Sequence, residues 1–481
     1  MYSEQDIREA RKKQNADMQK RWTDLEEDLI KRTSPETGSE ITEALKEMHA
    51  LLTDGGVVAW FANLYDPKTG GFYYSNSARD TDGFFPDLES TKQALSFFGS
   101  SGMAPEFGAD AARALPEWFG DGIVRFAKER QNKNGYFYNP QYPKEEADKR
   151  MARLGRDLDW GVGLLSMYGE QPTYDTPNGI RGNGLLYDGT PAPDYRKAEK
   201  SASSDTKYDP DEFVIEHLRD KESFIAHLES FERDDTVHKN SWYVGNHFES
   251  QATQIYERDK VLKARGADYS LCDILAEWFR KHQNKETGAW TLGETVNYDC
   301  TNGILKICST FNRMKREFPL PVRCVETAIK CIKHTTPIPS TCHALNPWYA
   351  LRNIVDNVER FNSSPDLERV KAEIDELRAY ILENCAEMIR KSSAKLSVLK
   401  MEDGSFEYAA NGNNGSSQGM PVSVNGIHEG NVNAYICTRA VAAHIYGLLG
   451  YENMPLFGAA DRMEFINILE KSRDEVLDLA K

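Results

Sequence analysis

The chain of 481 residues has 59 lysines and arginines against 75 aspartates and glutamates, a net charge of −16, and 40% hydrophobic residues. This composition is typical of a folded globular protein and excludes a disordered or fibrous chain. The acidic charge argues against nucleic acid or an anionic membrane surface as a partner, and no apolar run predicts a membrane span. Because residues 1–20 are strongly polar, without the apolar centre of a secretory signal, we expect the chain as given to be cytoplasmic.

Apolar residues recur at spacings of three and four through most of the chain, as in Leu271, Ile274 and Leu275. This period predicts amphipathic helices, and strand-like alternation is scarce. In chain order, the expected helices cover residues 3–32, 40–54, 88–98, 110–130, 147–168, 211–232, 248–264, 268–282, 300–317, 322–333, 345–360, 365–391, 432–449 and 460–479. Consecutive helices of this kind pair naturally into hairpins.

A degenerate turn recurs between the helices, in which polar residues are followed by a glycine and then by an aromatic residue. The glycine can adopt the positive φ that ends a helix, and we expect the aromatic side chain to fold back over the hairpin. The four copies place these two residues at Gly70 and Phe72, Gly135 and Phe137, Gly288 and Trp290, and Gly404 and Phe406.

This turn resembles the turns of α/α-toroid proteins, in which helical hairpins form two concentric rings. The resemblance spans residues 40–450 and implies an all-α fold, an incomplete (α/α)6–7 toroid with little or no β-sheet. We expect a single toroid domain over residues 1–481, with a lead-in helix within 1–35 and a peripheral C-terminal helix within 460–481. The alternative is an α-solenoid or an irregular bundle, but a solenoid has a more regular repeat period.

The cysteines and acidic pairs are interpreted as structural. The eight cysteines form no CxxC pair and lie mostly within apolar helical patterns, so we expect reduced, buried thiols. Asp157 and Asp159, like Asp234 and Asp235, are interpreted as solvated helix charges. The chain has no HxH or HExxH motif, so the sequence predicts no metal site and no cofactor. Residues 411–431 contain too few apolar side chains to be held by packing alone, and we expect them to border a cleft.

The sharpest combination of polar residues begins at the adjacent Asn246 and His247, which an aromatic loop brings to the start of the predicted helix 248–264. Tyr298 follows His247 by 51 residues, one helical hairpin with its loops, at the start of another helix. Since successive hairpins of a toroid are neighbours, we expect both side chains to face the same central cavity.

These residues resemble the site of the toroid polysaccharide lyases that act on alginate, heparin and related uronic-acid polymers. In those families an Asn-His pair at a helix start is followed, one hairpin later, by a catalytic tyrosine, and the matching residues here are Asn246, His247 and Tyr298. Gly245 stands where the family usually has a second asparagine, and the arginine often found just before the tyrosine is absent. The resemblance implies a lyase whose partner is an acidic poly- or oligosaccharide.

The chemistry of β-elimination suits these residue types. The reaction removes the weakly acidic proton beside a uronate carboxylate, so charge develops on an enolate-like intermediate. Asn246 is expected to donate a hydrogen bond to that charge, while Tyr298 and His247 share the roles of acid and base.

Other loop residues are expected to bind the substrate. Arginines suit a bidentate contact with a carboxylate, and aromatic side chains suit stacking on sugar rings. The candidates are Arg79, Arg181, Trp242, Tyr243, Glu249, Asn297, His428 and Glu429.

Three other functions fit parts of the sequence. A glycoside hydrolase needs two carboxylates about 5–10 Å apart. The carboxylates available for that role are Glu249, Glu294, Asp299 and Glu429. Asp299-Cys300-Thr301 resembles the acidic-Cys-Thr motif of triterpene cyclases, and a non-enzymatic glycan-binding toroid would share the stacking aromatic residues. The many polar loops favour a sugar ligand over a polyprene.

Overall fold

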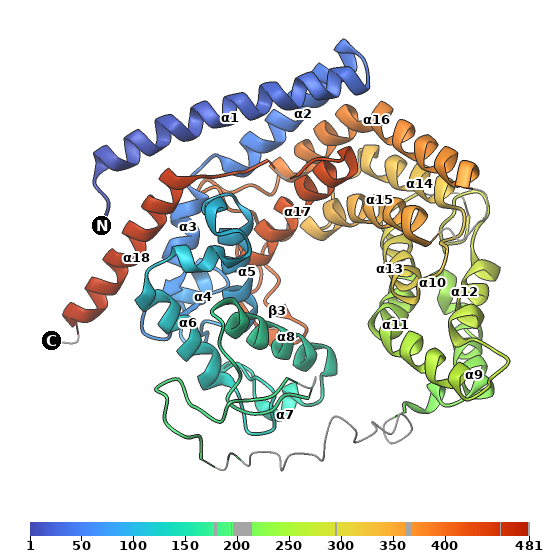
Figure 1. Cartoon of the computed structure of the whole chain (residues 1–481), viewed down its shortest axis with the longest axis horizontal. Helices are drawn as coiled ribbons and strands as arrows, with labels where there is room; N and C mark the ends of the chain where they lie inside the picture. Colours follow the sequence, from blue (N-terminus) through green and yellow to red (C-terminus); the bar gives the residue numbers. More distant parts are fainter. Residues whose placement is uncertain are drawn as a thin grey trace.

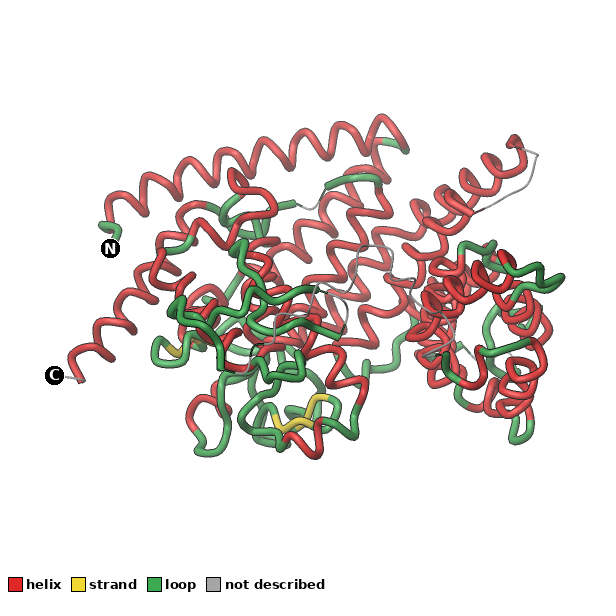
Figure 2. Tube along the Cα trace, turned by 60° about the horizontal axis from the view of Figure 1, so that its bottom comes forward, coloured by secondary structure: helices red, strands yellow, loops and turns green. Residues whose placement is uncertain are grey.

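Helices dominate the structure. The computed structural model describes residues 1–177, 180–193, 195, 214–293, 296–361, 367–452 and 454–479. In this part of the chain the named strands form two short antiparallel hairpins, β1 (Tyr65–Asp66) with β2 (Gly71–Phe72) and β3 (Ser416–Ser417) with β4 (Met420–Pro421). Figure 2 shows helices as nearly all of the regular structure. The expected all-α class is therefore confirmed.

Each expected helix has a counterpart among the long helices. These are α1 (Glu4–Arg32), α2 (Pro35–Thr53), α5 (Leu88–Ser100), α6 (Glu117–Arg130), α8 (Met151–Met167), α9 (Lys221–Glu232), α11 (Ser241–Ala264), α12 (Leu271–His282), α13 (Tyr298–Met314), α14 (Pro321–Lys333), α15 (Thr341–Phe361), α16 (Leu367–Ser397), α17 (Val432–Leu449) and α18 (Ala459–Leu479). Residues 211–213 and 365–366, where two expected helices begin, lie outside the described residues.

Several further short elements are present; the four helices among them lie in segments that were not predicted as helical or only touch a predicted helix, because one or two turns are too short to show a period, whereas the two 3-10 helices fall at the starts of the expected helices 110–130 and 211–232. They are the helices α3 (Val57–Asn63), α4 (Asn76–Asp80), α7 (Lys144–Ala147) and α10 (Thr236–Lys239), and the 3-10 helices η1 (Pro105–Ala114) and η2 (Glu216–Leu218).

Two boundary differences have local causes. α11 begins at Ser241, seven residues before the predicted start, because the side chain of Asn240 accepts a hydrogen bond from the backbone N–H of Tyr243 at 3.1 Å and caps the helix there. The helix expected over 110–130 is divided into η1 and α6, and Pro116 is the N-cap residue of α6.

All four repeated turns have the predicted geometry. The glycines Gly70, Gly135, Gly288 and Gly404 have φ angles of 85°, 82°, 71° and 82°, and the aromatic residues Phe72, Phe137, Trp290 and Phe406 are fully buried. Two copies also share a glutamine whose Nε2 donates to the glycine carbonyl: Gln283 to Gly288 at 2.8 Å and Gln131 to Gly135 at 3.3 Å. The turns are thus a structural repeat that closes each helix end over a buried ring.

Six helices form a series in which neighbours pack side by side: α11, α13, α15, α17, α5 and α8 (Figure 1). We call this series the helix array. α11 and α13 approach closely because glycines face their neighbours: a Cβ on Gly303 would lie 2.3 Å from Oγ of Ser241, and one on Gly245 would lie 2.7 Å from Cβ of Lys306. Residue numbers rise together along this contact, so the two helices run in the same direction.

The contact between α13 and α15 repeats this parallel register through asparagines. Nδ2 of Asn346 donates to Oδ1 of Asn302 at 2.7 Å, and Nδ2 of Asn353 donates to Oγ of Ser309 at 2.8 Å. Both pairs join residues 44 positions apart. Such bonds satisfy polar groups between packed helices and fix how one helix is set against the next.

A second set of helices lies outside the array. α12 packs on α11, α14 on α15, and α16 on α14 and α2. Figure 1 shows the array as an open arc between α8 and α11, with α16, α14 and α12 along its outer side. α1 packs on α2 and on α18. That the whole chain forms a single domain stays a prediction. Among the described residues, no helix combines the length and the apolar character needed to cross a bilayer.

The interpretation of Asp157 as a solvated charge is wrong. Its side chain is 2% exposed and accepts two hydrogen bonds from Arg153 at 2.9 and 2.5 Å, and Arg153 also donates to Glu89 of α5 at 2.6 Å. Burial raises the pKa of Asp157, and the Arg153 guanidinium opposes that rise. The sequence could not show this, because it does not indicate that this face of α8 packs against α5.

Candidate functional site

The starts of α13 and α15 bring two titratable side chains together. Tyr298 is the first residue of α13, and His343 lies in the first turn of α15. The bond between Asn302 and Asn346 sets the two helices in register one turn further on. Because the helices are parallel, a side chain at the start of one meets its counterpart on the next.

The contacts of Tyr298 define the site. Its ring meets the ring of His343 edge-on, with centroids 5.4 Å apart and planes at 78°. Its hydroxyl donates to the backbone carbonyl of Thr336 at 3.0 Å, and Nζ of Lys395 lies 5.4 Å from the ring centroid. Nδ1 of His343 lies 2.9 Å from Oγ of Ser340, which orients the imidazole. A phenol, an imidazole and an ammonium group therefore share one small region.

Burial shifts the pKa values of Tyr298 and His343 in opposite directions. It raises the pKa of Tyr298 well above its usual value, and the nearby Cys331 adds to the rise. It lowers the pKa of His343, an effect that the carboxylate of Asp299 partly opposes. Near neutral pH the phenol therefore keeps its proton while the imidazole stays neutral, which is the arrangement of a general acid beside a general base.

The structure does not bring His247 and Tyr298 together. Since Gly245 is level with Lys306, His247 lies about ten residues, or about 15 Å, along the array from Tyr298 at about 1.5 Å per residue. Nε2 of His247 lies instead 2.9 Å from Nε2 of His227 on α9. The separation arises because α11 begins level with Gly303 rather than with Tyr298, and because His247 lies six residues beyond the start of α11.

Asn246 and His247 occupy the second turn of α11, so their expected place at a helix start is wrong. The first turn instead carries Trp242 and Tyr243, which are 47% and 54% exposed. Exposed aromatic rings of this size can stack on a sugar, and this proposed role of the two residues stays a prediction.

The carboxylate of Glu249 has partners on the neighbouring helix. Nζ of Lys306 donates to it at 2.8 Å, and the guanidinium of Arg313 lies 3.8 Å away. Glu249 is half-buried, and both partners belong to α13. This side chain therefore joins two helices of the array.

Two candidates lie in the loop before α17. The buried carboxylate of Glu429 accepts hydrogen bonds from the backbone N–H of Ser77 at 2.8 Å and from Nδ2 of Asn413 at 2.9 Å, and so ties this loop to α4. Nδ1 of His428 lies 2.9 Å from Oε1 of Glu407, while most of its ring is exposed. Of the two, only His428 presents its side chain outward.

The remaining candidates lie apart from the Tyr298–His343 pair, except Asn297. Asn297 caps α13, where its Oδ1 accepts from the backbone N–H of Cys300 at 3.0 Å. Arg79 on α4 pairs with the adjacent Asp80 at 2.7 Å, and Arg181 lies exposed in the loop after α8.

The carboxylates considered for a hydrolase are dispersed. Glu294 lies outside the described residues, and Asp299 is exposed in the first turn of α13. Glu249 belongs to α11 and Glu429 to the loop before α17, two segments that pack against different neighbours.

The cysteines contain a pair that the sequence did not indicate. Sγ of Cys342 on α15 lies 3.8 Å from Sγ of Cys437 on α17, and the hydroxyl of Tyr408 donates to Cys342 at 3.4 Å. The hydrogen bond with Cys437, followed by the one with Tyr408, lowers the pKa of Cys342 to about 6 against the opposing effect of burial. The other cysteines are buried, as expected, and none of the eight forms a disulfide.

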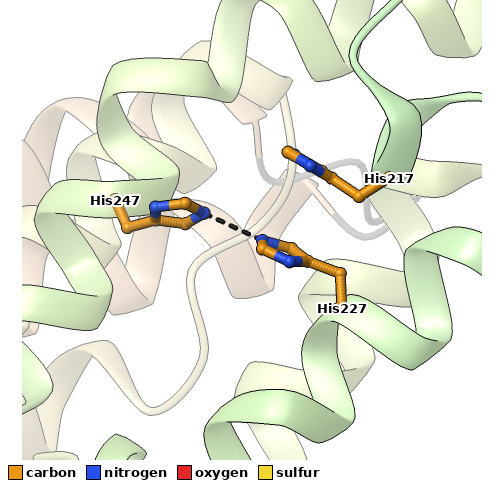
Figure 3. Close-up of side chains that lie close together, drawn as sticks. All are labelled: His217, His227 and His247. Atoms are coloured by element: carbon orange, nitrogen blue, oxygen red, sulfur yellow. Dashed lines mark hydrogen bonds between the residues drawn. The ribbon is translucent and has the colours of Figure 1, made fainter.

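A second cluster consists of three histidines from three elements: His217 in η2, His227 in α9 and His247 in α11 (Figure 3). The rings of His217 and His227 stack with centroids 4.0 Å apart. Burial, together with the two neighbouring imidazoles, lowers the pKa of His227 to about 4. No sequence motif predicted the cluster, because its members stand 10 and 20 residues apart in the chain.

A pocket of about 920 Å³ lies beside α6, and its lining includes Tyr65, Trp118, Tyr168 and Arg125. Neither the Tyr298–His343 pair nor the three histidines line this pocket. The sequence-predicted candidates do not line it either.

Comparisons with known proteins identify no relative of this chain. No family model matches it, and no curated protein or solved structure matches it either. A functional conclusion therefore depends on the geometry described above.

Proposed function

We propose that this protein is an incomplete α/α toroid that cleaves uronic-acid-containing poly- or oligosaccharides by β-elimination. The four repeated turns and the second set of helices outside the helix array support the architecture. The observation that carries the function is the contact between Tyr298 and His343, whose pKa values move in opposite directions. In this proposal His343 takes the role that the resemblance to the toroid lyases implied for His247.

In this reaction the neutral imidazole of His343 removes the proton from C5 of the uronate. The electron pair of the C5–H bond forms the C4–C5 double bond, and the C4–O bond breaks. The phenol of Tyr298 donates its proton to the departing oxygen. Each proton has a named acceptor, so the step needs no further reagent.

Lys395 suits the charge that develops during elimination. Its Nζ lies 5.4 Å from the Tyr298 ring, and it is held there by hydrogen bonds to the carbonyls of Cys331 at 3.3 Å and Ile332 at 2.7 Å. A cation fixed beside a uronate carboxylate stabilises the enolate-like state, in which negative charge moves onto the carboxyl group.

The hydrolase alternative has weaker support. Of its three described carboxylates, Glu249 and Glu429 are each engaged by local hydrogen bonds and belong to different parts of the fold, and Asp299 is exposed at the start of α13. A hydrolase would need two of them about 5–10 Å apart across a sugar bond.

The test is to incubate the purified chain with alginate, heparin and glucuronan and to follow ultraviolet absorbance. Elimination creates a C4–C5 double bond conjugated with the carboxyl group, so absorbance increases and mass spectrometry finds fragments that lack the elements of one water. Saturated fragments would establish a hydrolase instead. If all uronic-acid polymers stay intact while the protein is folded, the lyase proposal is wrong.

A further inference from the structure

Three imidazoles meet where η2, α9 and α11 come together (Figure 3). Each of His217, His227 and His247 offers one ring nitrogen, and these three nitrogens all lie within 4.8 Å of one another. Nε2 of His227 lies 2.9 Å from Nε2 of His247. The residues come from separate elements, so the cluster is a product of tertiary packing.

This donor set is suited to a particular class of ion. Imidazole nitrogen is a preferred ligand of Zn²⁺ and its first-row neighbours, whereas Mg²⁺ and Ca²⁺ require oxygen ligands. Three protein histidines with one further position open to water is an established arrangement for zinc in proteins.

The surroundings of the cluster have two features of metal sites in proteins, a hydrogen-bond partner for one ligand ring and apolar packing around another. Oε1 of Gln251 lies 2.8 Å from Nε2 of His217, and a partner of this kind fixes the orientation of a ligand ring. When Nε2–H donates to that oxygen, the lone pair remains on Nδ1. On the other side, Phe231 and Phe248 pack against His247 with ring centroids 5.3 and 5.0 Å away.

We propose that His217, His227 and His247 bind one divalent ion of the zinc class, with water at the open position. Ligand nitrogens at about 2.0–2.1 Å from a tetrahedral ion stand about 3.4 Å apart. Binding therefore separates His227 and His247 by about 0.5 Å and brings every separation, none of which exceeds 4.8 Å, to about 3.4 Å. The ion would join η2 and α9 to the helix array.

This inference does not depend on the proposed elimination. The cluster lies about 15 Å along the array from Tyr298, so the ion would not contact the Tyr298–His343 pair. Its readout is metal content, which remains measurable whether or not the protein cleaves a glycan.

The experiment is equilibrium dialysis of the full chain against Zn²⁺ after treatment with a chelator. We expect one equivalent per chain. His227→Ala should weaken the affinity by at least about 100-fold, since even the outer partners of zinc ligands contribute about 10- to 100-fold. His238→Ala is the matched control, because His238 is half-buried in the neighbouring α10 and bonds instead to Asp235 and the carbonyl of His282. It should keep full binding.

Cobalt spectroscopy keeps the proposal testable if His227→Ala does not fold. Co²⁺ bound by the wild-type chain should show the visible bands of a tetrahedral nitrogen site without the near-ultraviolet charge-transfer bands of thiolate ligands. Strong thiolate bands would place the ion at the cysteines and overturn the proposal. So would stoichiometric zinc in a folded variant lacking all three histidines, or no zinc uptake by the wild-type chain at micromolar concentration.

Discussion

The Tyr298–His343 pair and the three-histidine cluster both set an imidazole against other rings, but the fold builds them in different ways. The pair occupies matching positions on two parallel helices, and the Asn302–Asn346 bond holds that register one turn away. The cluster joins η2, α9 and α11, elements that share no register.

This difference decides what each group can do. Repetition along the helix array places unlike side chains, a phenol and an imidazole, at equivalent positions, and burial then moves their pKa values apart. Convergence of unrelated elements places like side chains together, where all three offer the same donor atom. The first arrangement suits proton transfer and the second suits metal binding.

The largest expected effect comes from removing the proposed acid. Tyr298→Phe should keep the fold and lower the turnover for elimination by about 10²–10⁴, the range for a positioned acid–base group. Zinc content should not change. The measurement is the initial rate of ultraviolet absorbance increase at saturating substrate, with Tyr380→Phe on α16 as the matched control. Turnover within a few-fold of wild type would remove Tyr298 from the mechanism.

Replacing the proposed base should also change the pH profile. His343→Gln should lower kcat/KM by about 10²-fold or more. Because the pKa of His343 is lowered, the wild-type rate should stay level down to below about pH 6.5 and fall only where the imidazole gains a proton. The raised pKa of Tyr298 places the alkaline fall above about pH 10. If the residual rate of the variant fell over the same acidic pH range as the wild-type rate, a different base would be responsible.

A third change tests whether register alone positions the pair. Asn346→Leu leaves the amide of Asn302, which is 3% exposed, without its partner, so we expect about 1–3 kcal/mol loss of stability. Elimination should fall while zinc affinity stays constant. Denaturant unfolding measures the stability, ultraviolet absorbance measures elimination, and equilibrium dialysis measures zinc affinity. Asn384→Leu on α16 serves as the control. Equal loss of both properties would indicate general unfolding rather than a shift of register.

The smallest expected effect concerns Glu249, which links α11 to α13. Glu249→Gln should reduce stability by less than about 1 kcal/mol, and less at high salt, because the ion pair with Lys306 is partly exposed. Fragments should remain unsaturated. If Glu249→Gln abolished cleavage and the products of the wild-type chain were saturated, the hydrolase would be supported instead.

The sequence determined the local structure of this protein. The three- and four-residue spacing located the long helices, and the glycine and aromatic residue of each turn predicted a positive φ over a buried ring. These features depend on residues close together in the chain, such as Gly288 and Trp290, so periodicity and steric limits are enough to predict them. The exact start of α11 was missed because it depends on one capping side chain, Asn240.

Tertiary structure decided which side chains meet. Tyr298 was identified from its place at a helix start, but its partner proved to be His343 rather than His247, because a small offset between neighbouring helices moves a side chain by a full turn or more. The convergence of His217 and His227 on His247 left no spacing signal in the chain. Contacts between distant segments depend on how helices pack, and a hydrophobic period specifies which face is buried but not what it meets.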